Sequence, residues 1–149
     1  LPISYELIVL LIQKEVADRL TAAPGTKAFG ALTVRVQYLA RTELIANVPR
    51  QAFSPPPKVD SAIIRLHPRS IFPSANNPKL LDTLVKLGFA SRRKMLYNNL
   101  RSVIKSDRLV SLLEKLNIAS QVRAENLSLE DWIALSNCID SVISPGGLL

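Results

Sequence analysis

The residues best suited to chemistry lie in one short segment, Phe53-Ser54-Pro55-Pro56-Pro57-Lys58-Val59-Asp60-Ser61. Consecutive prolines have a fixed φ and no N–H donor, so residues 55–57 predict a stiff, extended loop that cannot be an interior strand. A strand follows at once, because apolar residues recur on both faces of residues 59–66. Phe53 therefore has two possible roles: a flat aromatic surface presented at a cleft, or a buried plug that fills the core where a hairpin ends.

A second group of candidate residues is basic and lies between residues 86 and 108, where Asp107 is the single acid. The basic residues of this cluster are Lys86, Arg92, Arg93, Lys94, Arg101, Lys105 and Arg108. Such a cluster is either a solvated helix face or a surface that binds phosphates. Lys27 and Lys58 flank the expected aromatic pocket and are further candidates for steering a polyanion, although each can also be an ordinary surface lysine.

Other kinds of site find little support in the sequence. With one His and one Cys, neither an internal disulfide nor a metal site is expected. We interpret His67 as structural, and Glu130 and Asp131 as first-turn residues that suit a helix N-terminus. The net charge of +7 favours polyanionic partners. The apolar run of residues 7–12 is too short to span a bilayer.

The first half of the chain predicts strands and helices in alternation. Residues 7–12 are apolar on both faces, as in a central parallel strand covered by helices. A helix is expected from residue 13 to about 23, where Pro24-Gly25 ends it. Residues 42–48 predict a strand with Leu44, Ala46 and Val48 on one face, which forms an antiparallel hairpin with the strand from residue 59. Residues 32–38 alternate between apolar and polar side chains, which favours a strand by periodicity.

The second half predicts a group of helices after a linker over residues 68–78, which is rich in Pro, Ser and Asn. Asn77 is the expected N-cap of the first helix, which ends at Gly88. Ser128 and Asp131 have the spacing of a capping box before a last helix that runs to about residue 142. The apolar stripes of the first three helices are expected at Leu80, Leu84 and Leu87; at Leu96, Leu100, Val103 and Ile104; and at Leu109, Leu112, Leu113 and Leu116.

Several segments together resemble the ribosomal RNA adenine dimethyltransferases, which methylate adenine N6 with S-adenosylmethionine. Val48-Pro49, Phe53 and the Pro-Pro-Pro-Lys-Val-Asp-Ser run of residues 55–61 are similar to a late motif of that family. Residues 13–20 and 24–30 resemble the segments that follow the family's fifth strand. Phe89, residues 92–94, Asn99-Leu100 and residues 123–128 are similar to the C-terminal domain of the small-subunit branch.

The resemblance implies an α/β fold. Residues 1–67 would form the C-terminal part of a Rossmann-like class I methyltransferase sheet, residues 68–78 a linker, and residues 79–149 a small all-α RNA-binding domain. It also implies a helix, rather than a strand, at residues 32–38. Phe53 would stack on the flipped adenine. RNA would be bound by Arg92, Arg93, Lys94, Lys27 and Lys58.

The resemblance places the S-adenosylmethionine site in an N-terminal half that is not in this sequence. The family's Gly-rich turn, its acidic ribose ligand and its Asn-Leu-Pro-Tyr motif are all absent here, and Gly25, Gly30, Gly88, Gly146 and Gly147 form no strand-to-helix cofactor turn. We therefore expect this chain alone to bind no cofactor and to be inactive. Without the strands of the N-terminal half, the strand of residues 7–12 should also expose an apolar edge of the sheet.

The implied partner is small-subunit ribosomal RNA or a pre-ribosomal particle, with no membrane. The intact protein is expected to be a monomer in the bacterial cytoplasm, or in a plastid if the source is a eukaryote. Two alternatives stay open at this point. One is a large-subunit methyltransferase of the macrolide-resistance type, and the other is a non-catalytic RNA-binding or transcription-accessory relative of the same fold.

Overall fold

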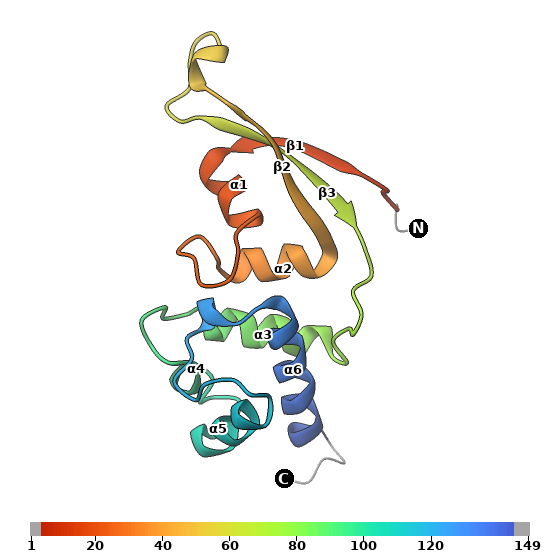
Figure 1. Ribbon diagram of the computed structural model, residues 1–149, viewed down its shortest axis with the longest axis vertical. Coiled ribbons are helices and arrows are strands. Elements are labelled where there is room, and N and C mark those ends of the chain that lie inside the picture. Colours follow the sequence, from red (N-terminus) through yellow and green to blue (C-terminus); the bar gives the residue numbers. More distant parts are fainter. Residues whose placement is uncertain (1–3, 145–149) are drawn as a thin grey trace.

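The computed structural model describes residues 4–144, which form a small sheet with two helices beneath it and a second group of helices below those (Figure 1). The last five residues of the predicted helical domain lie outside the described range. The elements in chain order are β1 (Ile8–Gln13), α1 (Lys14–Leu20), α2 (Ala31–Leu39), β2 (Ala40–Val48), β3 (Ser61–Pro68), α3 (Pro78–Gly88), α4 (Leu96–Asn99), α5 (Ser106–Lys115) and α6 (Leu129–Ile143). Within residues 4–144, no helix has the length and apolar character needed to cross a bilayer.

The sheet has the strand order β1-β3-β2, and both pairings are antiparallel. The hairpin of β2 and β3 confirms the prediction. The strand expected at residues 7–12 is present as β1, which lies at the edge of the sheet as predicted. Its pairing with β3 is antiparallel, so within the described residues the parallel neighbour of the prediction is not seen. Helices α1 and α2 cover one face of the sheet, so Val9 and Leu11 on the other face remain 58% and 55% exposed.

A bulge in β2 changes which of its side chains share a face. The pairing register shifts between Leu44, which lies opposite Ile64, and Ala46, which lies opposite Ile63. Ile63 and Ile64 are neighbours on β3 and therefore point to opposite faces of the sheet. Their partners Ala46 and Leu44 point to opposite faces as well. The expectation that Leu44, Ala46 and Val48 share one face is therefore wrong, because Ile45 is an extra residue in the ladder.

The face of the sheet that α1 and α2 leave open carries a charged group around Glu43. Arg65 Nη2 lies 2.8 Å from each carboxylate oxygen of Glu43. The hydrogen bond and positive charge of Arg65 hold the pKa of Glu43 below its ordinary value. His67, which we predicted to be structural, lies beside the same carboxylate, with its Nε2 3.8 Å from Glu43 Oε2. Glu43 and Arg65 thus form a cross-strand ion pair on the open face of the sheet, with the His67 ring beside it.

Helix α2 forms where the alternating pattern favoured a strand and where the family resemblance implied a helix. Its apolar residues point in two directions. Val34 and Tyr38, four residues apart, pack into the core of the helical part, and Val36 packs beneath the sheet. The helix is thus buried on two sides, which explains why its sequence lacks the single stripe of an amphipathic helix.

Two polar side chains of α2 donate hydrogen bonds to backbone carbonyls at the C-terminal end of α1. The Thr33 hydroxyl donates to the Arg19 carbonyl at 2.6 Å, and the Gln37 amide donates to the carbonyls of Leu20 and Ala22 at 3.2 and 3.1 Å. The last carbonyls of a helix have no partner inside it, so these bonds complete α1. They also explain why α1 ends at Leu20, before the predicted end near residue 23.

The helical part confirms both predicted N-caps. The Asn77 side chain accepts from the Leu80 N–H at 3.2 Å, and Ser128 and Asp131 form a reciprocal capping box. The stripe of α3 differs in part from the prediction. Leu84 is buried as expected, but the other buried side chains of this helix are Leu81 and Val85, while Leu80 and Leu87 are half-buried.

The predicted second helix of the helical part is only one turn long. After α4 the chain continues in turns that still bury Leu100 and Ile104. The Asn99 side chain donates to the carbonyls of Gly88 and Ser91, both at 2.9 Å. This side chain anchors the end of α4 to the preceding loop, and the helix does not extend beyond it.

The expected linker is fastened to the helical part. The Ala75 N–H donates to the Tyr38 hydroxyl at 3.1 Å, and Ala75 is buried. Asn137 of α6 accepts from the Asn76 N–H at 2.8 Å and donates to the Ser74 carbonyl at 3.1 Å. Phe29 and Val34, which precede the linker, belong to the same buried core as the helices that follow it. The two parts of the chain therefore share a core.

Gly88 supplies the closest approach in that core, and Gly88→Ala tests it. An added Cβ would lie 2.6 Å from the Trp132 side chain and 3.2 Å from that of Leu96. Overpacking costs roughly 1–3 kcal/mol, which should exceed the gain in helix propensity of about 1 kcal/mol. We expect urea denaturation to show a net loss of stability of up to about 2 kcal/mol. Gly30→Ala is the control, since a Cβ there meets nothing within 4 Å; equal losses in both variants would contradict the packing argument.

Candidate nucleic-acid interface

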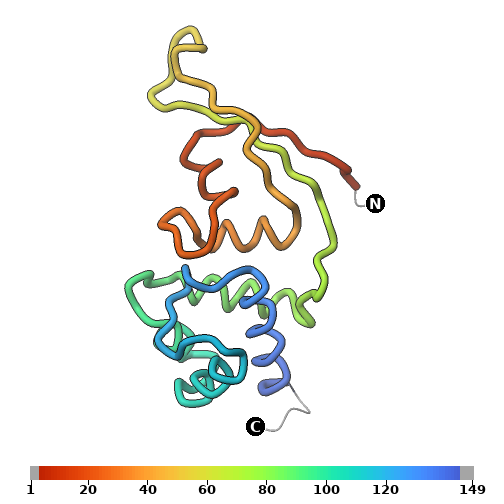
Figure 2. The backbone as a smooth tube through the Cα atoms, in the orientation of Figure 1, coloured from red at the N-terminus to blue at the C-terminus, as the bar shows by residue number. Residues whose placement is uncertain are grey.

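Phe53 lies on a loop that projects beyond the sheet, between β2 and β3 (Figure 2). A 3₁₀ turn, Arg50–Ala52, precedes it, and the three prolines follow. Phe53 is half-buried and belongs to neither of the two buried cores. The structure therefore does not support the alternative in which Phe53 is a core plug, and it leaves the aromatic ring at the periphery of the sheet.

A hollow of about 570 Å³ lies between the base of this loop and α1. Lys58 lines it, as expected for a residue that flanks the aromatic segment, together with Lys14 and Arg50. Lys14 is paired with Asp18 at 3.0 Å, so its charge is compensated within the protein. Within residues 4–144, neither Lys58 nor Arg50 forms an ion pair. These two cations are the ones available to a polyanion beside Phe53.

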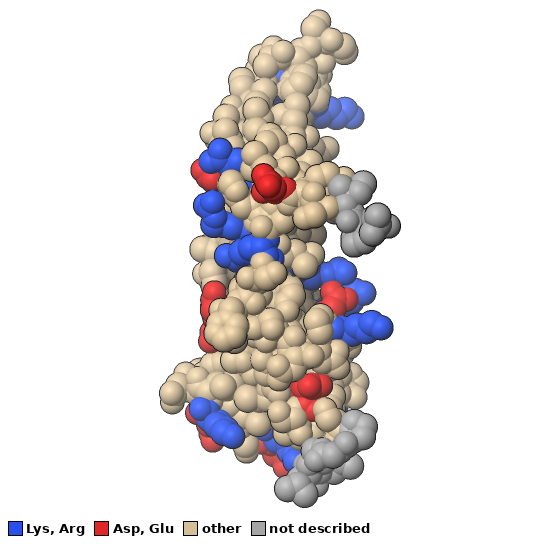
Figure 3. Space-filling view, turned by 90° about the vertical axis from the view of Figure 1, so that its right-hand side faces the viewer, with Lys and Arg blue, Asp and Glu red and all other residues tan. Residues whose placement is uncertain are grey.

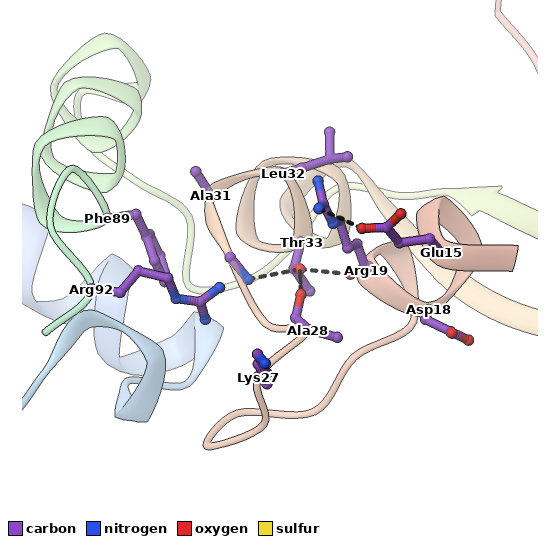
Figure 4. Close-up of a pocket in the computed structure, with 11 residues that line it drawn as sticks. Glu15, Asp18, Arg19, Lys27, Ala28, Ala31, Leu32, Thr33, Phe89 and Arg92 are labelled. Carbon is purple, nitrogen blue, oxygen red and sulfur yellow. Dashed lines mark hydrogen bonds and ion pairs between the residues drawn. The ribbon is translucent and has the colours of Figure 1, made fainter. Parts of the chain in front are cut away.

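A second hollow, of about 640 Å³, lies farther along α1, between the loop of residues 21–30 and the helical part (Figure 4). Lys27 from this loop and Arg92 from the helical part, both predicted to bind RNA, line it. Glu15 and Asp18 line both hollows. The wall of the second hollow thus carries charges of both signs, and the Glu15 carboxylate is already paired with Arg19 at 2.9 Å.

Arg92 is engaged inside the protein. Its Nη2 donates to the Phe29 carbonyl and lies 3.3 Å from Glu125 Oε2, and its guanidinium lies 5.7 Å from the centre of the Phe89 ring. The Glu125 carbonyl in turn accepts from the Gly25 N–H at 2.7 Å. Arg92 and Glu125 therefore tie the loop of residues 21–30 to the helical part, a role that the basic run alone did not indicate.

Aromatic packing supports the same junction. Phe29 is fully buried, and its ring centre lies 6.3 Å from that of Phe89. The Phe89 ring lies 5.8 Å from Trp132 of α6. Tilted pairs at these distances are favourable. Phe29 and Glu125 lie in segments that carry the family resemblance, but their contact with Arg92 could not be read from the sequence, since they lie 63 and 33 residues from it.

Arg93 and Lys94 differ from Arg92. Both are exposed, and neither makes an ion pair or a side-chain hydrogen bond within residues 4–144. They line neither hollow. The basic side chains visible in Figure 3 are spread along that face and are interrupted by acidic ones. The part of the chain that the structure describes also holds no cluster of three or more His, Cys, Asp or Glu suited to a metal ion.

Replacing Arg92 should cost stability, whereas replacing its neighbour should not. Hydrogen bonds to a charged group contribute roughly 1.5–3 kcal/mol. Because Arg92 is 41% exposed, we expect Arg92→Ala to lose about 1–2 kcal/mol. Arg93→Ala is the matched control and should stay within about 0.5 kcal/mol of wild type. Thermal and urea unfolding measure both. Equal stability of the two variants would contradict the internal role of Arg92.

Comparison with known proteins agrees with this architecture. The family model described as ribosomal RNA adenine dimethylase matches residues 3–141. A protein of Rippkaea orientalis named ribosomal RNA small subunit methyltransferase A is 63% identical over 139 residues, which are 93% of this chain and 51% of that protein. The protein of the same name in Crocosphaera subtropica is 60% identical over 134 residues, which are 90% of this chain and 50% of that protein.

Two solved structures share the fold. A dimethyladenosine transferase from Plasmodium falciparum is 27% identical with a TM-score of 0.71, covering 88% of this chain and 56% of that one. The 23S rRNA methyltransferase ErmE is 25% identical with a TM-score of 0.66, covering 91% of this chain and 55% of that one. The chain spans about half the length of the curated relatives it matches. It belongs to the ribosomal RNA adenine dimethylase family.

Proposed function

We propose that this chain is part of a small-subunit ribosomal RNA adenine N6,N6-dimethyltransferase. Its role would be to position the target base and to bind the RNA backbone. The observation that carries the proposal is the position of Phe53, which lies outside both cores on a stiff loop beyond the sheet. An exocyclic adenine nitrogen can be methylated only when the base leaves its stack, and a flipped base needs a flat surface to rest on. Phe53 would provide that surface.

S-adenosylmethionine would supply the methyl group, and the residues described here do not fit its binding. Within residues 4–144, β1 runs directly into α1 without a glycine turn, and the glycines at positions 25, 30 and 88 follow no strand. The cofactor would be held by sequence outside this chain. We therefore propose that the chain alone is inactive and that its own contribution is to position the base.

Binding of the RNA backbone would rest on Arg93, Lys94, Lys27 and Lys58. The first two are exposed and unpaired within residues 4–144, and Lys27 and Lys58 line the two hollows beside α1. Arg92 would hold the junction instead of binding phosphates, because its guanidinium already has partners. The domain division at residues 67 and 79 remains part of the proposal, with a helical domain that binds RNA.

The relatives favour small-subunit RNA over the alternatives. The curated relatives at 63% and 60% identity are named ribosomal RNA small subunit methyltransferase A, whereas the 23S rRNA methyltransferase structure is 25% identical to this chain. A non-catalytic relative would have lost the cofactor-binding motifs of the N-terminal half. The sequence of that half would therefore distinguish such a relative from an active enzyme. We propose that the intact protein is a monomer that acts on the small-subunit RNA or its precursor particle, in the bacterial cytoplasm or in a plastid.

The number of phosphates that Arg93 and Lys94 neutralise can be measured from the dependence of RNA affinity on salt concentration. Replacing both residues with Ala should weaken RNA binding and lower the log-log slope of affinity against salt by on the order of 0.7 for each single-strand phosphate that is no longer neutralised. Filter binding at several salt concentrations measures the slope. Lys115→Ala, on the far end of α5, is the control and should leave the slope unchanged. An unchanged slope in the double variant would place the RNA elsewhere.

Phe53→Ala in the full-length protein tests the proposed function itself. Losing an aromatic partner costs roughly 1–3 kcal/mol per stacked base, so methylation of RNA should fall about fivefold to about 150-fold. Cofactor affinity and melting temperature should stay near wild type, since Phe53 lies outside both cores. Phe53→Tyr and Phe53→Trp should retain much of the activity. A destabilised Phe53→Ala protein with normal activity per molecule would rule out the stacking role.

A further inference from the structure

We propose that Asp60 is a positioning residue that holds the Phe53 loop in place by bracing it against the sheet and α1. The inference rests on the proposed function, in that the loop's orientation matters because Phe53 meets the target base. Asp60 stands at the foot of the loop, immediately before β3, whose first residue Ser61 pairs with Gln13 and Val48. Its backbone is therefore anchored at the end of the sheet, and its carboxylate and carbonyl bond to two different neighbours.

The carboxylate of Asp60 caps the turn that leads to Phe53. Its Oδ1 accepts from the Arg50 N–H at 2.9 Å. Arg50 begins the 3₁₀ turn, and the first N–H groups of a helical turn have no acceptor within it. Asp60 thus does from across the loop what an N-cap residue does from the adjacent position. The turn ends with the Phe53 N–H donating to the Arg50 carbonyl at 3.2 Å, so a short series of hydrogen bonds joins Asp60 to Phe53.

The main chain of Asp60 makes the second connection. Its carbonyl accepts from the Lys14 N–H at 3.0 Å. Lys14 is the first residue of α1, so its N–H also lacks a partner within its helix. One residue therefore satisfies the starts of two helical segments, and the loop is placed relative to α1.

Few other bonds could hold this loop. Residues 55–57 are prolines without N–H donors. Within residues 4–144, the other side-chain hydrogen bond across the loop is a long one, 3.5 Å from Arg50 Nη1 to the Lys58 carbonyl. Asp60 forms no ion pair within residues 4–144, and the nearby Lys14 ammonium is paired with Asp18. The carboxylate therefore acts as a hydrogen-bond acceptor and not as a counter-charge, which predicts that an amide oxygen at this position can replace it.

The experiment compares Asp60→Ala and Asp60→Asn in the full-length protein, with Asp18→Asn as the control. Asp18 carries the same charge and lines the same hollow but does not bond to the loop. Asp60→Ala should lower kcat for RNA methylation about tenfold, while KM for RNA stays within about twofold and the melting temperature within about 2 °C. Asp60→Asn should keep most of the activity because its side-chain oxygen accepts the same N–H. Asp18→Asn should keep the wild-type kcat because Asp18 does not bond to the loop, although the variant leaves the Lys14 ammonium unpaired.

A second measurement tests the hydrogen bond between the Arg50 N–H and the Asp60 carboxylate directly. Hydrogen exchange of the Arg50 amide should accelerate in Asp60→Ala and stay slow in Asp60→Asn and Asp18→Asn. A wild-type kcat in Asp60→Ala, or an equal loss in Asp60→Asn, would overturn the positioning role. If the full-length wild type fails to methylate RNA, the proposed function fails, whereas unchanged Arg50 exchange in Asp60→Ala would refute the brace independently of that outcome.

Discussion

The structure depends on the burial of α2 between the sheet and the helical part. Val36 packs beneath the sheet, while Val34 and Tyr38 enter the core of the helices on the other side. A helix that is apolar on two sides must be covered on both, since each exposed apolar side chain forfeits part of the burial energy. Helix α2 therefore holds the two parts of the chain together, and the loop carrying Phe53 keeps a defined position relative to the helices.

The junction around Arg92 reinforces this arrangement with polar contacts. A guanidinium can donate in several directions at once, and here it reaches a carbonyl, a carboxylate and an aromatic face that come from three separate segments. The Glu125 carboxylate and carbonyl bind Arg92 and Gly25 respectively. In a run of three basic residues, Arg92 thus stabilises the fold, while Arg93 and Lys94 are exposed and form no ion pair within residues 4–144.

The prolines of the Phe53 loop make it rigid but do not fix its orientation relative to the sheet. A loop with three consecutive prolines is stiff within itself but has few donors with which to fasten itself to the rest of the protein. Its orientation must come from the residues at its two ends, and Asp60 and the turn at Arg50–Ala52 provide the contacts. Rigidity and orientation therefore have different sources in this loop.

The sequence by itself determined the local elements and the family. Asn77 and Ser128 predicted their caps because capping depends on residues three apart, and the proline run predicted its loop because φ is restricted within each residue. The motifs around Phe53 and Arg92 identified the family because their order and spacing are linear features. The hairpin of β2 and β3 also followed from neighbouring segments.

The tertiary structure alone decided the features that depend on distant partners. At residues 32–38 the family resemblance implied the helix, whereas periodicity favoured a strand, because a helix covered on both sides has no single apolar stripe. Packing against the sheet and the helical part explains this pattern. The bulge at Ile45 and the internal use of Arg92 follow the same rule. Each is set by side chains and strands far away in the chain, and sequence spacing carries no measure of their distance in space.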